Sequence, residues 1–212
     1  MINWWIRCLA ALRRLRYPGS LRYWERRYAR GGHSGAGSQG RLAAYKANWL
    51  NQFVQENAVQ TVVEFGCGDG QQIQLANYPD YLGLDVAPSA IRRCRALFAA
   101  DTRKRFDLYD PYHFSPETAR AELALSVEVL FHVTEDALYQ RYLRHLFAAS
   151  SRWVVIFSAD EPDRTGGRFP HLKPRRFTAD APPGWALRRR DDNPCADISI
   201  SNFFVFEKTG SF

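Results

Sequence analysis

The stretch VVEFGCGDGQQ, residues 62–72, decides the fold of this 212-residue chain. Residues 61–65, TVVEF, are mostly β-branched or apolar and predict a buried strand. Gly66 and Gly68 follow at once and allow a tight turn that a ligand can approach closely, where a Cβ would clash. We expect the next helix to begin at Gly70. The free amides of its first turn could then hold a carboxylate.

A second acidic residue stands at the end of the next predicted strand, YLGLDV, residues 81–86. Asp85 follows Gly66 by 19 residues. A carboxylate in this place can accept hydrogen bonds from both hydroxyl groups of a ribose. The glycine turn and the strand-end acid therefore predict a site for an adenosine-containing cofactor at the carboxyl ends of the strands.

NAD is the main alternative cofactor. Its fingerprint, G-x-G-x-x-G, needs a third glycine beneath a pyrophosphate, and Gln71 occupies that position. Glu64 also places a negative charge where an amino group, and not a pyrophosphate, would be favoured. Both features argue against NAD, although NAD, another nucleotide and a turn without a ligand remain open at this point.

Strands and helices alternate over the middle of the chain, which predicts an α/β fold with a parallel sheet and right-handed crossovers. The predicted strands are 61–65, 81–86, 105–110, 121–126 and 152–159, and the predicted helices are 21–30, 41–59, 70–78, 89–100 and 136–150. Beyond residue 160, GWALRRR and ISISNFFVFEK predict two strands with no helix between them. An antiparallel pair at the sheet edge accounts for them.

The composition is that of a globular protein with one main domain. Hydrophobic residues make up 46% of the chain, and the formal net charge of +7 favours anionic partners. The four cysteines show no CxxC spacing, so we expect no zinc site or other metal site, no disulfide framework, and a reducing cytoplasmic location. No apolar run approaches the ~20 residues needed to span a bilayer.

The N-terminal residues MINWWIRCLAALRRLR predict a basic amphipathic helix. Tyr17-Pro18-Gly19-Ser20 ends it, so we expect an N-terminal helix over residues 1–19 and a main domain over 20–212. We expect the helix to pack on the domain or on a partner, or residues 1–16 to lie in the headgroup layer of an anionic membrane, such as the inner membrane surface. Disorder of this segment is the third alternative.

EFGCGDG followed by YLGLDV resembles motifs I and II of class I S-adenosylmethionine-dependent methyltransferases. More narrowly, YWERRYARGGHSGAGSQG, ALSVEVLFHVTED and HLKPRRF are similar to a bacterial methyltransferase-domain group whose members are often found beside glycosyltransferases. The likeness spans roughly residues 22–207. It implies a Rossmann-like fold with a seven-stranded, mostly parallel sheet, an antiparallel edge strand and helices on both faces.

The resemblance also implies cofactor-binding roles. Glu64 and the turn would hold the methionine part of S-adenosyl-L-methionine, Asp85 the ribose, and Val86 and Asp110 the adenine, while Tyr28 and the loop with Gly37 would close over the methionine end. The full predicted set is Tyr28, Gly37, Ser38, Glu64, Gly66, Cys67, Gly68, Asp85, Val86, Asp110, Ser126 and Val127.

Acceptor chemistry is predicted from the residues after the fourth strand. SVEVLFHVTED lacks the N/D-P-P-Y/F signature of enzymes that methylate base or amide nitrogens, which favours a hydroxyl acceptor on a small molecule or glycan. His132 is the candidate general base, with Glu128 as the second candidate. His171, Arg175 and Arg176 would hold an anionic acceptor.

Two other functions remain open. The positive charge also suits an RNA methyltransferase, but no RNA-binding module is recognisable and the arginines are scattered, so nucleic acid is the less favoured partner. The N-terminal helix would suit a catalytically silent protein at a membrane surface. The intact glycines and Asp85 argue against that alternative.

Overall fold

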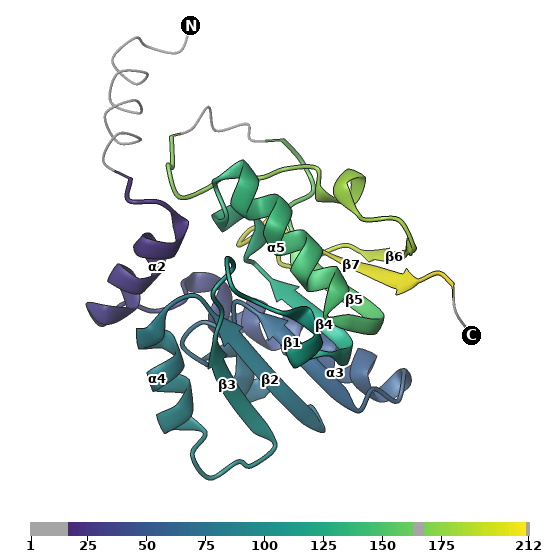
Figure 1. The fold of residues 1–212 in the computed structure, drawn as a ribbon, viewed down its shortest axis with the longest axis horizontal. Coiled ribbons are helices and arrows are strands. Elements are labelled where there is room, and N and C mark those ends of the chain that lie inside the picture. The colour runs from purple at the N-terminus through teal and green to yellow at the C-terminus, as the bar shows by residue number, and fades with distance from the viewer. Residues whose placement is uncertain (1–16, 163–167, 211–212) are drawn as a thin grey trace, which may run out of the picture.

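The computed structural model describes residues 17–162 and 168–210. Its centre is a seven-stranded sheet in the order β3-β2-β1-β4-β5-β7-β6 (Figure 1). The strands are β1 Thr61–Phe65, β2 Asp80–Asp85, β3 Lys104–Leu108, β4 Ala121–Val127, β5 Ser150–Ser158, β6 Trp185–Asp191 and β7 Asn202–Lys208. The first five strands pair in parallel. The predicted α/β fold is confirmed.

The C-terminal strands form the predicted antiparallel pair. β7 runs antiparallel to both β5 and β6, and β6 forms the edge of the sheet. The charged side chains of β6 are mostly exposed, as suits an edge strand that must not pair with another molecule. The central strands β1 and β4 are instead buried along almost their whole length, as expected for strands covered on both faces.

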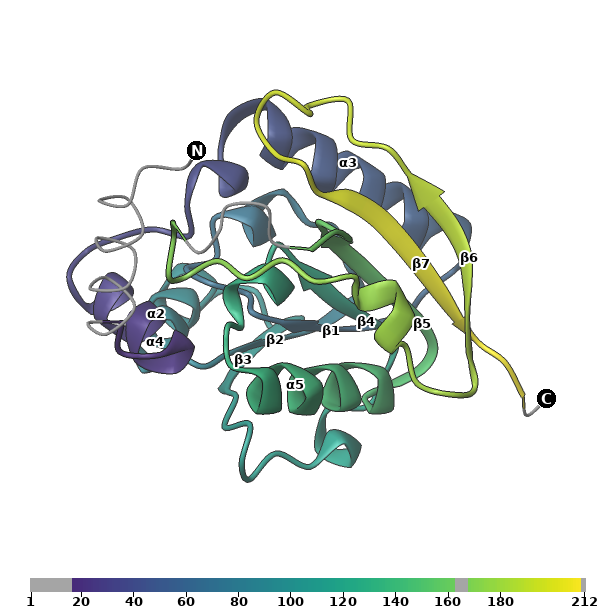
Figure 2. The same cartoon turned by 90° about the horizontal axis from the view of Figure 1, so that it is seen from above.

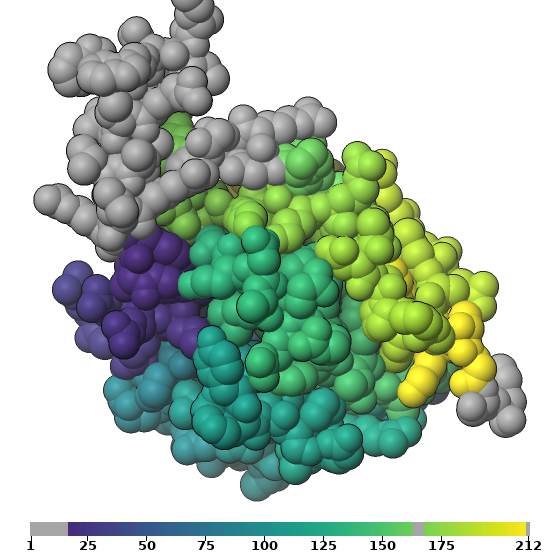
Figure 3. Space-filling model, turned by 45° about the horizontal axis from the view of Figure 1, so that its top comes forward, coloured from purple at the N-terminus to yellow at the C-terminus, as the bar shows by residue number. Residues whose placement is uncertain are grey.

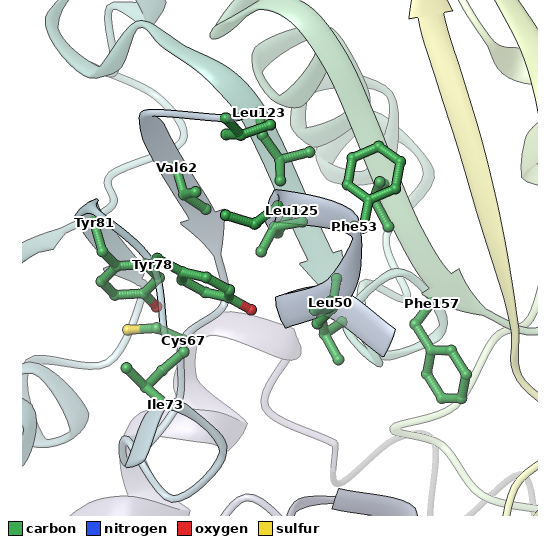
Figure 4. Packing of buried hydrophobic residues seen from close by; sticks show 14 of the residues in the cluster. Leu50, Phe53, Val62, Cys67, Ile73, Tyr78, Tyr81, Leu123, Leu125 and Phe157 are labelled. Atoms are coloured by element: carbon green, nitrogen blue, oxygen red, sulfur yellow. The ribbon is translucent and has the colours of Figure 1, made fainter. Parts of the chain in front are cut away.

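Helices cover both faces of the sheet, as predicted. They are α2 Ser20–Ala29, α3 Gly40–Glu56, α4 Pro88–Leu97 and α5 Asp136–Ala148. α3 and α4 pack on one face and α5 on the other, and Figure 2 shows α3 and α5 on opposite sides of the strands. In the α3 layer, Leu50 and Phe53 share a core with Val62 and Leu123 (Figure 4).

The helix predicted at residues 70–78 is wrong. Gly70 has φ +82°, outside the helical region, and only a short 3₁₀ turn, Gln72–Leu75, follows it. Pro79 then leads directly into β2. The chain passes from the glycine turn into a compact loop.

α2 is the first described helix and lies against the end of α4 and the residues that follow β4. Gly19 precedes it with φ +86°, and Ser20 is its first residue. In Figure 3 the purple surface of α2 adjoins the green surface of residues near 130. The predicted basic helix at residues 1–16 lies outside the described residues. Over the described chain, no helix has the length and apolar character needed to cross a membrane.

Candidate active site

The glycine turn that follows β1 is hydrogen-bonded to the end of β2. The backbone amides of Gly66 and Cys67 both donate to the carbonyl oxygen of Leu84, at 2.6 and 3.0 Å. Gly66 has φ +86°, and a Cβ built there would lie 2.4 Å from Cγ2 of Val129. A side chain at this position is therefore excluded by both the backbone conformation and the neighbouring chain.

Asp85 ends β2 with its carboxylate fixed by two backbone amides. Gly68 N–H donates to Oδ2 at 2.9 Å and Ala87 N–H to Oδ1 at 2.8 Å. Only 6% of the residue is exposed, and this burial raises the pKa of Asp85 to about 6. Each carboxylate oxygen keeps a free lone pair, so the group can still accept hydrogen bonds from a ligand.

Glu64 places a second buried carboxylate beside the turn. Its Oε2 accepts a hydrogen bond of 2.8 Å from the hydroxyl of Tyr81. Burial raises the pKa of Glu64 to about 7, although the Tyr81 hydrogen bond and the nearby Lys46 oppose the rise. At neutral pH this carboxyl group is poised between its two protonation states.

Both carboxylates line a cavity of about 610 Å³, a size typical of small-molecule sites. Most of the predicted site residues line it. They are Tyr28, Gly37, Ser38, Glu64, Gly66, Cys67, Asp85, Val86, Val127, Glu128, His132 and His171. The structure thus brings together residues predicted for the cofactor and residues predicted for catalysis.

Five predicted site residues lie outside the cavity lining: Gly68, Asp110, Ser126, Arg175 and Arg176. Gly68 acts on the site through its hydrogen bond to Asp85. Asp110 is half-exposed and pairs with His113 at 2.7 Å, and the hydroxyl of Ser126 is buried against that of Tyr142 at 2.7 Å.

Arg175 uses its guanidinium within its own chain. It donates to the carbonyl oxygens of Val133 and Thr134, at 2.8 and 3.0 Å, and pairs with Asp136 at 2.9 Å. The guanidinium carbon also lies 4.2 Å from the centre of the Tyr139 ring. These contacts hold the segment after β5 against the start of α5, and they leave little of Arg175 for an anionic acceptor. Of the predicted basic cluster, His171 lines the cavity.

The loop before α3 is fastened to the glycine turn. Ser34 donates from its hydroxyl to Oδ1 of Asp69 at 2.7 Å and from its amide to Oδ2 at 3.2 Å. The Ser34 hydroxyl also lies 3.1 Å from the hydroxyl of Tyr28. These contacts place Gly37 and Ser38 over the cavity. The side chains of Ser34 and Asp69 were not predicted as site residues.

His132 lies in a 3₁₀ turn after β4 and is enclosed by aromatic rings. The Trp24 ring meets it edge-on with centroids 4.8 Å apart, and the His171 ring stacks at 5.9 Å. Burial lowers the pKa of His132 to about 4, so the ring is neutral at pH 7. Nδ1 lies 3.1 Å from the carbonyl oxygen of His171. Since a carbonyl can only accept, Nδ1 carries the hydrogen and Nε2 carries the lone pair.

α2 fixes the turn that carries His132. The Ser20 hydroxyl lies 2.8 Å from the His132 carbonyl oxygen and 2.6 Å from Oε2 of Glu135. The Ser20 amide donates to Oε1 of the same carboxylate at 2.8 Å. Glu135, an acid near the candidate base in sequence, therefore serves to hold the start of α2.

Glu128 adopts φ +58°, a conformation rare for a residue with a side chain. Its Oε2 accepts from the ammonium of Lys46 at 2.8 Å and its Oε1 from the Ser199 hydroxyl at 3.0 Å. A Cβ on Gly37 would lie only 1.9 Å from this Oε2, so the loop approaches closely because residue 37 is glycine. Both oxygens of Glu128 are engaged, which makes it a weaker candidate base than His132. Lys46 and Ser199 were not predicted as site residues.

A parallel sheet with β7 inserted antiparallel, a glycine turn after β1 and buried acids in β1 and β2 define the class I methyltransferase fold and its S-adenosylmethionine site. Residues 62–150 match the family model described as a methyltransferase domain, and the chain is an S-adenosylmethionine-dependent methyltransferase. A search of curated proteins found no match.

Solved structures support the same fold. The N-methyltransferase NodS from Bradyrhizobium japonicum WM9, in complex with S-adenosyl-L-homocysteine, is similar with a TM-score of 0.69 and 16% identity over 91% of this chain and 100% of NodS. Magnesium protoporphyrin IX methyltransferase from Synechocystis PCC 6803, with bound S-adenosylhomocysteine, gives 0.61 and 16% over 78% and 83% of the two chains. At these identities the likeness concerns the fold alone.

The residues of the cavity fit S-adenosylmethionine. Asp85 has lone pairs for the two ribose hydroxyls, and Glu64 offers a negative charge to the methionine amino group. The glycine at position 66 lets Val129, which also lines the cavity, pack closely against the turn. The cofactor supplies a methyl group on a positively charged sulfur, and the protein's task is to hold that sulfur in line with an acceptor.

Proposed function

We propose that the enzyme methylates a hydroxyl group on a small molecule or glycan, with His132 as the general base. The observation that carries this proposal is the state of the His132 ring, which is neutral and has Nδ1 committed to the His171 carbonyl. Nε2 is then the nitrogen that can take a proton. A hydroxyl acceptor needs such a base because its own pKa is far above neutral.

In this mechanism the acceptor oxygen forms a bond to the methyl carbon while the bond from that carbon to sulfur breaks and its electron pair goes to sulfur. The hydroxyl proton passes to Nε2 of His132. Trp24 and His171 keep the imidazole in one orientation, and Ser20 holds the backbone that carries it.

Two further observations support a hydroxyl on a glycan or related molecule. The end of β4, SVEV, lacks the N/D-P-P-Y/F motif that binds planar amide and base nitrogens. The sequence also resembles methyltransferase domains that occur beside glycosyltransferases. The acceptor side is aromatic and holds few free cations, so a neutral acceptor is favoured over a strongly anionic one.

The test is methyl transfer from labelled S-adenosylmethionine to matched panels of glycans and amines, with kcat/KM followed against pH. For a hydroxyl acceptor with His132 as base, kcat/KM for the acceptor, measured at saturating S-adenosylmethionine, should rise as the imidazole loses its proton near pH 4 and stay level through neutrality. With an amine acceptor, kcat/KM would instead rise with pH around the pKa of each amine. Label found only on amines would overturn the proposal.

A further inference from the structure

One end of the cavity is polar and is assembled from segments far apart in the sequence. Lys46 of α3, only 1% exposed, pairs with Glu128 after β4. Ser199, in the loop before β7, donates to the same carboxylate and accepts from the amide of Ser201 at 3.3 Å. All four of these residues line the cavity.

Two atoms at this end have no partner. Over the described chain, Oε1 of Gln72 and Oγ of Ser201 are buried without a hydrogen bond. Gln72 and Ser201 are 9% and 1% exposed, and both line the cavity. The Gln72 amide nitrogen donates to the carbonyl oxygen of Ala43 at 3.0 Å, one helical turn before Lys46. Buried polar atoms are nearly always satisfied, so this pair marks the place of a ligand with both donors and acceptors.

The charges of the cavity are complementary to the methionine part of the cofactor, which carries an ammonium and a carboxylate. Glu64, Asp85 and Glu128 are its acidic residues. Among the described lining residues, Lys46 is the sole lysine or arginine. A carboxylate brought into this mostly acidic cavity therefore has one favourable cation to meet, and Lys46 uses one of its three donors on Glu128.

We propose that Lys46 and Ser201 bind the carboxylate of the methionine part, and that Gln72 Oε1 accepts a hydrogen bond from its ammonium. Lys46 thereby becomes a specificity-determining residue: it makes the cavity select nucleosides that carry the amino-acid carboxylate over those that lack it. Glu128 holds the ammonium of Lys46 in the direction of the cavity. The Ser199 hydroxyl keeps Glu128 in place, which also explains why a residue with φ +58° is tolerated here.

Calorimetry with two ligands tests this assignment without any acceptor. S-Adenosylhomocysteine carries the carboxylate and ammonium, whereas 5′-deoxy-5′-methylthioadenosine has the same nucleoside and thioether without them. Lys46→Met should weaken S-adenosylhomocysteine binding at least about tenfold and change the Kd of the second ligand less than about twofold. Lys104→Met is the matched control, because Lys104 is also buried and ion-paired, to Asp101, but lies outside the cavity.

Ser201→Ala gives a second, independent variant. Its hydroxyl has no partner in the described chain, so its removal should leave folding intact and weaken S-adenosylhomocysteine alone by roughly three- to tenfold. Equal weakening of both ligands in the two variants, or no weakening of either ligand, would overturn the proposal. If Lys46→Met does not fold, the Ser201→Ala result decides. Neither measurement depends on the hydroxyl acceptor, so the two proposals fail separately.

Discussion

The two halves of the cavity are built in different ways. The donor half takes Glu64, Gly66 and Asp85 from one continuous stretch of chain, and the pairing of β1 with β2 brings them together at the carboxyl ends of the strands. The acceptor half takes Ser20, His132 and His171 from three separate segments, with Ser20 lying 112 residues before His132, and hydrogen bonds between side chains and backbone join them. The sheet thus fixes Glu64, the glycine turn and Asp85, while Lys46 and Ser201 join the donor half from α3 and from the loop before β7. The acceptor half can change with its own loops and leave β1 and β2 intact.

Burial has opposite effects in the two halves. It raises the pKa of Glu64 to about 7 and of Asp85 to about 6, because it disfavours a negative charge. It lowers the pKa of His132 to about 4, because it disfavours a positive charge. In the donor half, a cationic ligand would therefore favour the ionised carboxylates. In the acceptor half, the imidazole of His132 is neutral and can accept a proton. The following predictions test whether the halves are as separate as this contrast indicates.

Replacement of Asp85 should give the largest effect, and it should be confined to cofactor binding. Asp85→Ala removes a carboxylate that we expect to accept two hydrogen bonds from ribose, and such charge-assisted bonds contribute about 1.5–3 kcal/mol each. We therefore expect the Kd for S-adenosylhomocysteine to rise roughly 100-fold or more in calorimetry.

Asp107→Ala is the matched control for this experiment. Asp107 lies on the neighbouring strand β3, is exposed, and pairs with Arg95 at 2.7 Å. Its loss should leave the Kd unchanged. An unaltered Kd in the Asp85 variant, with the protein folded, would remove Asp85 from the cofactor site.

Replacement of His132 should affect turnover and leave cofactor binding nearly unchanged. A base with a pKa of about 4 is fully neutral at pH 7 but only weakly basic, so we expect the lower end of general-base contributions, about 100-fold in kcat for His132→Ala. Steady-state kinetics with the best acceptor, together with calorimetry, measure the two quantities. Wild-type turnover in the variant would refute the role, and an equal loss of cofactor affinity would show that the two halves are coupled.

The donor half was largely predictable from sequence, since its signal is local. Glu64, the glycine turn and Asp85 belong to two strands whose alternation with helices predicts their pairing. The helix predicted at residues 70–78 was wrong, because Gly70, where it should begin, has φ +82° and only a 3₁₀ turn follows. The antiparallel pair was predicted because two strands without a helix between them follow residue 160, whereas the order of the strands was not predicted.

The polar and acceptor contacts were less predictable because they depend on tertiary packing. Lys46 reads as an ordinary polar position of an amphipathic helix until Glu128, 82 residues later, is placed against it. Arg175 reads as a free cation, yet its partners are carbonyl oxygens about 40 residues earlier in the chain. A sequence shows which groups are charged, but only the fold shows which partners satisfy them.

The smallest predicted effect is a pH dependence of cofactor affinity that belongs to the donor half. Glu64 has a raised pKa of about 7 in the free enzyme, and a cationic ligand favours its ionised form, so binding must release a proton below pH 7. The affinity for S-adenosylhomocysteine should then fall up to about tenfold for each unit that the pH drops below 7, with a further contribution from Asp85 below about pH 6. Calorimetry in buffers of different ionisation enthalpy measures both the Kd and the released proton.

Glu64→Gln should remove most of the pH dependence of the Kd between pH 6 and 8, whereas the rise of turnover near pH 4 that belongs to His132 should stay in place. If the Kd of this variant keeps its pH dependence, Glu64 does not meet the ligand's charge.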